Sequence, residues 1–281
     1  MSEISDQAPC EDWWATSIIE MRPGMIRYRG YAIEDLIGRI SFPAMIWLML
    51  RGELPSEGQA DLLGTALMAA VDHGPQAPSI AIARMAATCG VGINNAMASA
   101  INVLGDVHGG AGEQCVEIYQ AIAARMDGGE ELAVAVEAEL AALAGRGIKF
   151  VPGFGHRFHP IDPRAPRLLE VVEAAAAEGV VDGRFAAIGR AVEEALAQRK
   201  GGKRIPMNID GATAVIYAEL GFPPPLCRGL FVLSRSVGAL AHAWEQMQAS
   251  ERNKGPIPRR YLWRYRGAEH RTLSEVEPSS V

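Results

Sequence analysis

Apolar residues recur along most of this chain every three or four residues, which is the spacing of one face of an α-helix. In one such segment, residues 42–49, Ser41 stands where an N-cap is expected, Pro43 falls in the first turn, and the pattern ends at Gly52. The same spacing predicts helices over residues 61–71, 80–104, 113–126, 130–143, 166–178, 185–198, 211–220 and 225–250. Alternation with a period of two is nearly absent, and short strands are expected only at residues 28–31 and 260–265. The pattern therefore predicts an all-α fold.

The composition is that of an ordinary globular protein, with 281 residues of which 49% are hydrophobic and 21% charged. The net charge of −6 argues against a nucleic-acid partner, because nucleic-acid-binding domains are usually basic. The first residues lack the basic and apolar regions of a signal peptide, and no apolar run approaches the ~18 residues of a membrane span. We therefore expect a cytoplasmic protein without a membrane partner, whose scattered cysteines are free thiols: Cys10, Cys89, Cys115 and Cys227.

The length suits one large domain or two modest ones. Residues 146–224 contain two Ala-rich helical segments and two of the polar segments described below, and we interpret them as a small domain. The flanking residues 1–145 and 225–268 would then form one large helical domain. Residues 269–281 contain Ser and Glu without apolar periodicity, so we expect a flexible tail there.

Three short polar segments interrupt the helical pattern, and each places a titratable side chain near glycine. Residues 105–110 read Gly-Asp-Val-His-Gly-Gly, residues 151–156 read Val-Pro-Gly-Phe-Gly-His, and residues 206–211 read Pro-Met-Asn-Ile-Asp-Gly. Glycine lets a backbone approach a ligand closely, because it has no Cβ. A site for proton transfer is therefore indicated by two histidines and one carboxylate, His108, His156 and Asp210.

Arg235 lies inside a strongly apolar helical segment, residues 230–240. A buried arginine needs an anionic partner, and both an internal salt bridge and a ligand carboxylate are open interpretations. The basic loop at residues 200–204 is either a solvated turn or a contact for phosphate groups. We interpret His242, within a helix, and His270, near the C-terminus, as structural residues.

The surrounding residues argue against two other kinds of site, a metal site and a nucleotide-binding site. His156 and His159 have the spacing of metal ligands and Asp162 is near, but no second pair of histidines or cysteines completes the set, so no metal is expected. The glycines at residues 153–155 and 201–202 follow no predicted strand, so they lack the context of a Rossmann or P-loop nucleotide site.

Several short motifs occur in the order found in the citrate synthase family, which the chain resembles over residues 25–266. Each motif is weak alone, but the ordered set is specific. The resemblance implies a helical fold with a large and a small domain and with ligands in the cleft between them. The motifs are Arg-Tyr-Arg-Gly-Tyr-Ala-Ile-Glu-Asp-Leu at 27–36, Arg-Gly-Glu-Leu-Pro at 51–55, Asp-His-Gly at 72–74, His-Gly-Gly-Ala-Gly-Glu at 108–113, Pro-Gly-Phe-Gly-His-Arg at 152–157, Asp-Pro-Arg at 162–164, Asn-Ile-Asp at 208–210 and Ser-Arg at 234–235.

The resemblance also implies roles for individual residues. His108 would stabilise the enol of acetyl-CoA, Asp210 would take the methyl proton, and His156 would act on the carbonyl of the oxo acid. The residues implied to hold substrate carboxylates, the last of them across a dimer interface, are His73, Arg164, Arg235 and Arg259. Contacts with coenzyme A are implied for Pro152, Gly153, Phe154, Gly155, Asn208 and Lys203. No metal or other cofactor is implied, because coenzyme A enters as the thioester substrate.

The chain departs from the usual family pattern in ways that favour one branch of it. Only sixteen residues separate Pro55 from Asp72, where the family has a long helical stretch, and Gly112 stands where asparagine is common. The short chain, with its segments at residues 72–75 and 231–238, resembles the citryl-CoA lyase module of ATP-citrate lyase, which cleaves citryl-CoA to acetyl-CoA and oxaloacetate.

The resemblance therefore implies a citryl-CoA lyase that makes or breaks the C–C bond between acetyl-CoA and oxaloacetate. Two alternatives stay open: a complete citrate synthase that also hydrolyses citryl-CoA to citrate and CoA, and a non-catalytic acyl-CoA-binding relative. The implied partners are acetyl-CoA or citryl-CoA, oxaloacetate or citrate, and further copies of the chain in a homodimer or higher even oligomer.

Overall fold

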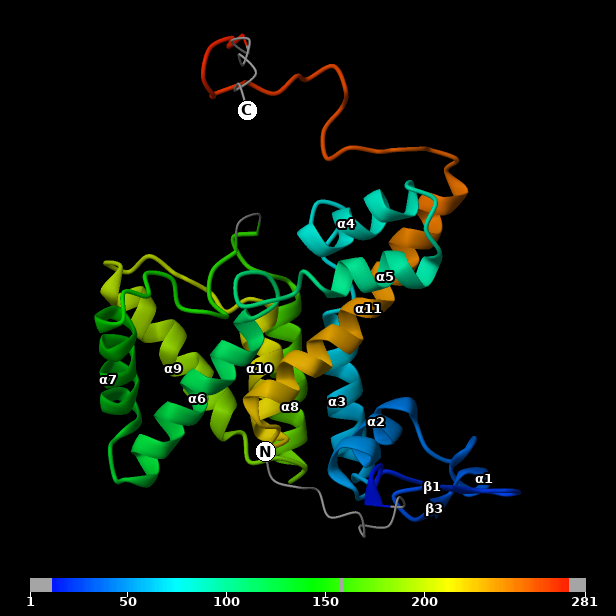
Figure 1. Ribbon diagram of the computed structural model, residues 1–281. Coiled ribbons are helices and arrows are strands. Elements are labelled where there is room, and N and C mark those ends of the chain that lie inside the picture. The colour runs from blue at the N-terminus through cyan, green and yellow to red at the C-terminus, as the bar shows by residue number, and fades with distance from the viewer. Residues whose placement is uncertain (1–11, 157–158, 273–281) are drawn as a thin grey trace, which may run out of the picture.

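The structure is a computed structural model that describes residues 12–156 and 159–272. Helices dominate this part of the chain, so the predicted all-α fold is confirmed (Figure 1). They are α1 (Ile33–Leu36), α2 (Phe42–Arg51), α3 (Glu57–Ala69), α4 (Pro78–Ala87), α5 (Ile93–Ile101), α6 (Ala111–Asp127), α7 (Leu132–Gly145), α8 (Arg164–Ala177), α9 (Arg184–Arg199), α10 (Ile209–Glu219) and α11 (Pro224–Gln248).

A small antiparallel sheet precedes the helices, in the order β1 (Ile19–Arg22), β2 (Met25–Tyr28) and β3 (Tyr31–Ala32). The strand expected at residues 28–31 is therefore a turn between the end of β2 and the start of β3. Arg29 and Gly30 have φ angles of 49° and 89°, and this left-handed backbone reverses the chain. The strand β1 was not expected from the sequence.

Local sequence signals predict both ends of α2 correctly but miss the break between α4 and α5. The Ser41 side chain accepts a hydrogen bond from the backbone of Ala44 at the start of α2, and Gly52 ends that helix with φ at 88°, as predicted. The single helix expected at residues 80–104 is wrong, because α4 ends before Thr88 and α5 begins after Gly92. Two glycines lie in the break, and Gly90 has a φ of 83° that an α-helix does not allow.

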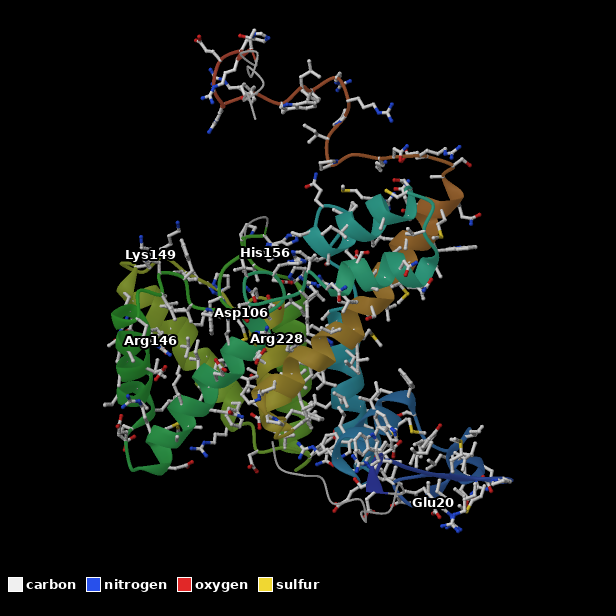
Figure 2. The ribbon with its side chains drawn as sticks, viewed as in Figure 1. Glu20, Asp106, Arg146, Lys149, His156 and Arg228 are labelled. Carbon is white, nitrogen blue, oxygen red and sulfur yellow. The ribbon has the colours of Figure 1, made fainter. Side chains whose placement is uncertain are left out.

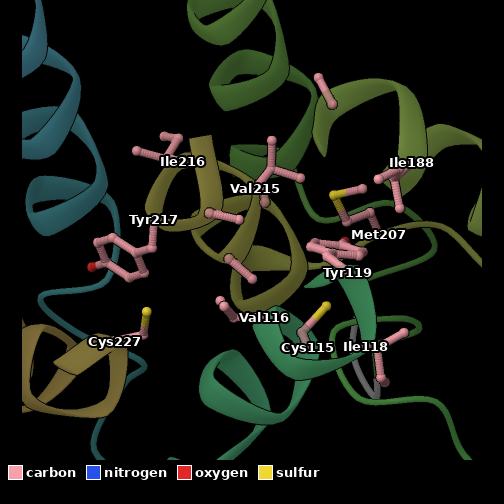
Figure 3. Close-up of a cluster of buried hydrophobic side chains, with 14 of the residues drawn as sticks. Cys115, Val116, Ile118, Tyr119, Ile188, Met207, Val215, Ile216, Tyr217 and Cys227 are labelled. Atoms are coloured by element: carbon pink, nitrogen blue, oxygen red, sulfur yellow. The ribbon is translucent and has the colours of Figure 1, made fainter. Parts of the chain in front are cut away.

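The main apolar core surrounds α10, which packs against α3, α6, α8 and α9. Every residue of α10 from Gly211 to Ala218 is buried, as expected of a helix that is hydrophobic on all sides. Figure 3 shows side chains of α6, α9 and α11 converging on this helix. The labelled members of this main core are Cys115, Val116, Ile118, Tyr119, Ile188, Met207, Val215, Ile216, Tyr217 and Cys227.

A second, smaller cluster joins α4 and α5 to the C-terminal half of α11 (Figure 1). We call it the alanine cluster, since its buried members are Ala77, Ile80, Ala83, Ala96, Ala100, Ala239 and Ala243. Gly238 on α11 donates its backbone N–H to the carbonyl of Val71 at 3.1 Å. A Cβ at Gly238 would collide with that carbonyl, so only glycine allows α11 to contact the loop after α3 so closely.

After α11 the chain runs away from the helical body as an exposed, extended segment (Figure 1). The strand expected at residues 260–265 is absent from this described segment, where no neighbouring strand lies alongside it. Of the predicted tail, residues 269–272 are exposed, and residues 273–281 lie outside the described residues, as does Cys10.

The other three cysteines are free, as predicted, with Cys115 and Cys227 buried and Cys89 exposed. Within the described residues, none of the helices has the length and apolar character needed to cross a bilayer. The division into a large domain, a small domain and a tail stays a prediction, as does a cytoplasmic location.

Candidate active site

A pocket of about 280 Å³ opens between the loop after α3 and the loop that leads into α8. The rings of His73 and His156 meet edge to face in it, with centroids 5.5 Å apart, and His159 lies beyond, 4.7 Å from the ring of His156. The pocket is lined by Asp72, His73, Gly74, His156, His159, Asp162, Pro163 and Arg164. The structure therefore brings together three of the predicted site residues, His73, His156 and Arg164, from segments far apart in sequence.

His108 lies in the tight loop before α6, where the backbone N–H of Gly105 bonds to the His108 carbonyl at 2.8 Å. This loop is tied to α11 by an ion pair between Asp106 and Arg228, which Figure 2 labels, with N and O atoms 2.6 Å apart. Arg228 also pairs with Glu113 in the first turn of α6. The loop that carries His108 is thus held from two helices.

The backbone N–H of Ser79, in the first turn of α4, donates to Nε2 of His108 at 3.1 Å, and Ser79 Oγ lies 3.0 Å from the same atom. Because Nε2 accepts this bond, the proton of the neutral imidazole sits on Nδ1. Burial and the positive charge of Arg235 lower the pKa of His108. His108 therefore presents an uncharged ring with one N–H donor available to a ligand.

Asp210 occupies the first turn of α10, behind the N-cap Asn208. The Asn208 side-chain oxygen accepts from the backbone of Asp210 at 2.9 Å, and its amide group donates to the Gly155 carbonyl at 2.7 Å. Burial raises the pKa of Asp210, while the positive charges of Arg235 and Arg164 oppose that shift. A carboxyl group in this setting is suited to gaining and losing a proton during a reaction.

The second and third polar segments lie directly against each other. The Gly155 N–H donates to the Pro206 carbonyl at 2.8 Å, and the Asn208 N–H donates to the Gly153 carbonyl at 2.9 Å. A Cβ on Gly153 would lie 2.6 Å from Sγ of Cys115 and 2.8 Å from Cα of Gly211. At Gly153 the missing side chain thus allows two chain segments to touch.

Arg235 is only 4% exposed, with its guanidinium 4.8 Å above the ring of Phe231. Its Nε donates to the Ala70 carbonyl at 3.2 Å, and among the described residues no carboxylate forms an ion pair with it. This favours the ligand carboxylate over the internal salt bridge as its anionic partner. The charge of Arg235 lowers the pKa of His73 and of His108 and opposes the rise in the pKa of Asp210, so one guanidinium acts electrostatically on all three groups.

Arg164 already has a carboxylate partner within the chain. Its Nε and one terminal nitrogen each bond to an oxygen of Asp162 at 2.9 Å, and Asp162 also accepts the backbone N–H of Ile209 at 3.1 Å. Burial alone would raise the pKa of Asp162, but the hydrogen bonds from Arg164 and Ile209 outweigh it and lower that pKa. From the sequence, Asp162 had no role in the site beyond its place in the Asp-Pro-Arg motif and the rejected metal set, although its position two residues before Arg164 at a helix start is a signal for such a pair.

The pocket histidines are also held uncharged near neutral pH. Burial lowers the pKa of His73, and the positive charges of Arg164 and Arg235 lower it further. Burial lowers the pKa of His156 as well, against the opposing effect of Asp162. An uncharged imidazole can accept a proton, so His156 is suited to act as a base.

The remaining predicted residues lie away from this pocket or beneath it. Phe154 is buried, Lys203 is exposed in the loop after α9, and Arg259 is exposed on the extended C-terminal segment. The predicted contacts of Pro152–Gly155, Asn208 and Lys203 with coenzyme A, and of Arg259 with a neighbouring subunit's site, stay predictions.

Comparison with known proteins decides the family. The family model described as citrate synthase, C-terminal domain, matches residues 10–63 and 57–266. The chain belongs to the citrate synthase family. Among curated family members, it is 32% identical to the citrate synthase of Haloferax volcanii over 203 residues, which cover 71% of this chain and 50% of that protein. The chain thus spans about half the length of the curated citrate synthases it matches.

Solved structures of the family extend the comparison. The citryl-CoA lyase of Hydrogenobacter thermophilus is 30% identical, with a TM-score of 0.81, and the match covers 93% of this chain and 97% of that one. An ATP citrate lyase from Methanothrix soehngenii, solved with citrate and coenzyme A, shares the fold at 21% identity and a TM-score of 0.77, covering 91% of this chain and 42% of that one. The match thus spans nearly all of the Hydrogenobacter citryl-CoA lyase and less than half of the Methanothrix ATP citrate lyase.

Proposed function

We propose that the protein is a citryl-CoA lyase that makes or breaks the C–C bond between acetyl-CoA and oxaloacetate. The observation that carries the proposal is the fixed, uncharged His108, whose Nε2 accepts the Ser79 N–H and leaves an Nδ1–H donor, while the charge of Arg235 acts on both His108 and Asp210. The fold agrees better with a citryl-CoA lyase, at a TM-score of 0.81 and 30% identity, than with solved citrate synthases, at TM-scores of 0.57–0.68 and 19–24% identity, and this supports the lyase over the synthase.

The carboxylates of the oxo acid would bind to Arg235, Arg164 and His73. Arg235 has no carboxylate ion pair among the described residues, and a buried guanidinium binds a carboxylate through two parallel hydrogen bonds. His73 lines the same pocket as Arg164, so both can contact one small polyanion.

In the cleavage direction, His156 accepts the proton of the tertiary hydroxyl of citryl-CoA. The C–C bond breaks as that carbon becomes the ketone of oxaloacetate, and the bonding electrons move into the thioester to give the enolate of acetyl-CoA. Negative charge develops on the thioester oxygen, where the Nδ1–H of His108 stabilises it as a preorganised donor.

Asp210 then gives a proton to the terminal carbon of the enolate, which becomes the methyl group of acetyl-CoA. The raised pKa of Asp210 makes its protonated form more accessible than that of an ordinary aspartate. His156 has gained one proton and Asp210 has lost one, and exchange with solvent restores both. In the condensation direction the same groups exchange roles.

The experiment that tests the proposal supplies citryl-CoA and, separately, acetyl-CoA with oxaloacetate. Release of oxaloacetate from citryl-CoA without free CoA is the result expected of a lyase. Free CoA and citrate from the second mixture would instead identify a complete citrate synthase. A folded protein that binds acyl-CoA and yields no product from either mixture would be the non-catalytic relative.

A homodimer or higher even oligomer is part of the proposal. Leu233, Val237, Leu240 and Trp244 are exposed on successive turns of α11, and an apolar stripe of this kind is suited to an interface. Arg259 on the extended segment would then reach the site of a neighbouring subunit. Light scattering should show an even oligomer, and an active monomer would contradict this part.

A further inference from the structure

The buried carboxylate of Asp162 connects the two halves of the proposed chemistry. It is 1% exposed, and four donors surround it: the backbone N–H, Nε and one terminal nitrogen of Arg164, and the backbone N–H of Ile209. We propose that Asp162 is a positioning residue that fixes the guanidinium of Arg164 and the start of α10 relative to each other. The inference rests on the proposed function, because it assigns substrate binding to Arg164 and proton transfer to Asp210.

The contact with Arg164 fixes the orientation of the guanidinium. Both oxygens of Asp162 bond along one edge of it, each at 2.9 Å, and this two-point contact sets the plane of the group as well as its distance. The opposite terminal nitrogen makes a long contact of 3.5 Å to the Ala69 carbonyl. That end of the guanidinium is the part left for a substrate carboxylate.

The contact with Ile209 fixes the helix that carries Asp210. Ile209 is the first residue of α10, and its N–H donates to the same Asp162 oxygen that binds the Arg164 terminal nitrogen. A negative charge is stabilising at a helix N-terminus. Because one oxygen serves both contacts, removing its charge releases the carboxylate-binding arginine and the first turn of α10 together.

The chain contains a matched control that has a purely structural version of this contact. Glu219 accepts backbone N–H groups of Gly183, Phe185 and Ala186 at the start of α9, at 2.7–3.1 Å, and it lines no part of the pocket. Glu219→Gln should therefore lower the melting temperature and leave KM and kcat within about twofold of wild type. This variant measures the effect of losing a carboxylate at a helix N-terminus that lies away from the proposed site.

The test compares Asp162→Asn with Glu219→Gln, using cleavage of citryl-CoA and direct calorimetric binding of oxaloacetate. We expect Asp162→Asn to raise KM and the Kd of oxaloacetate by about tenfold or more and to lower kcat as well. In an Arg164→Gln background, where the guanidinium is gone, the same substitution should add less than about twofold to KM, because contacting residues are not additive. Asp162→Glu keeps the charge but moves it by one methylene, and it should raise KM by an intermediate amount.

The inference is overturned if folded Asp162→Asn has wild-type KM, kcat and Kd and differs only in melting temperature, as Glu219→Gln does. If Asp162→Asn does not fold, wild-type kinetics in Asp162→Glu would overturn it equally. A wild-type protein that releases no product from either substrate mixture removes the proposed function. In that case the Kd of oxaloacetate still tests the role of Asp162. Weaker binding by Asp162→Asn than by the wild type would support the inference, and equal binding would overturn it.

Discussion

The two sides of the proposed site rest on different kinds of packing. Asp210 lies in the first turn of α10, the helix at the centre of the main core, and the loop before it is held against residues 153–155 by backbone hydrogen bonds and by close glycine contacts. His108 takes its hydrogen bond from Ser79 at the start of α4, whose buried apolar residues Ile80 and Ala83 belong to the alanine cluster. The carboxylate of Asp210 is therefore held by the large main core. The position of the proton on the His108 imidazole depends on a helix that is packed by the small alanine cluster.

The difference has an energetic consequence. A buried Ile, Leu or Met contributes about 1.5–3 kcal/mol, whereas each methylene-sized group such as an alanine methyl contributes about 0.8 kcal/mol. The alanine cluster joins α4 and α5 to α11 through small side chains and a close glycine contact at Gly238. Opening of this side of the site should therefore cost less free energy than opening of the side that α10 holds.

The largest expected effect is on the core side of the comparison. Asp210→Asn should reduce kcat for cleavage by about a thousandfold, because the amide cannot donate or accept the carbon-bound proton. The side chain keeps its shape, so the melting temperature and the binding of oxaloacetate should change little. Exchange of the acetyl-CoA methyl protons with deuterium, followed by NMR, should be lost as well; wild-type exchange in this variant would exclude Asp210 as the base.

Hydrogen exchange measured by mass spectrometry tests the packing difference itself. Amides in α10 should exchange at least about a hundredfold more slowly than those in α4 and α5, which corresponds to about 2.7 kcal/mol in opening free energy. The main core buries almost all of α10, whereas α4 buries only Ser79, Ile80 and Ala83. Equal protection of these helices would show that the two sides open as one unit.

Substitution of Arg235 tests the positive charge that acts on both Asp210 and His108. Arg235→Lys should raise KM for citryl-CoA by at least about tenfold, or about 1.4 kcal/mol, because lysine cannot reproduce two parallel hydrogen bonds from a fixed plane. Arg39→Lys, on an exposed arginine paired with Asp35, is the control and should have wild-type kinetics. An unchanged KM in Arg235→Lys would remove Arg235 from the binding site.

Substitution of Ser79 tests the hydrogen bond that sets the imidazole tautomer. Ser79→Pro removes the N–H at a helix start, where proline is tolerated, as Pro224 and Pro225 show at the start of α11. We expect kcat to fall about fivefold, because His108 loses the donor that keeps its proton on Nδ1. Ser79→Ala keeps that N–H and should lower kcat by less than about twofold. Equal losses in the two variants would assign the effect to the hydroxyl instead.

The smallest expected effect is a shift to lower pH of the acid side of the pH profile of kcat/KM. Burial and neighbouring positive charges lower the pKa values of His73, His108 and His156 below the ordinary 6.5. These groups therefore stay uncharged as the pH falls to that value, and kcat/KM for cleavage should decline only at lower pH, as they gain protons. A decline that begins well above pH 6.5 would contradict the uncharged state assigned to these three histidines.

Local sequence pattern determined the all-α class, most helix segments and the cap at Ser41, because these depend on residues within one or two turns. It also identified His108, His156 and Asp210 as titratable groups beside glycine. The motif order indicated the family, and the roles that it implies for the site residues are predictions.

Tertiary structure alone decided how these groups are held. Ser79 lies 29 residues from His108, and Asp162 lies 47 residues from Ile209, so neither hydrogen bond leaves a signal in the local pattern. The break between α4 and α5, and the use of Gly153 for contact between chain segments, likewise depend on what each segment meets in the fold. Sequence specifies which groups can carry protons, whereas packing between distant segments sets their tautomers, charges and orientation.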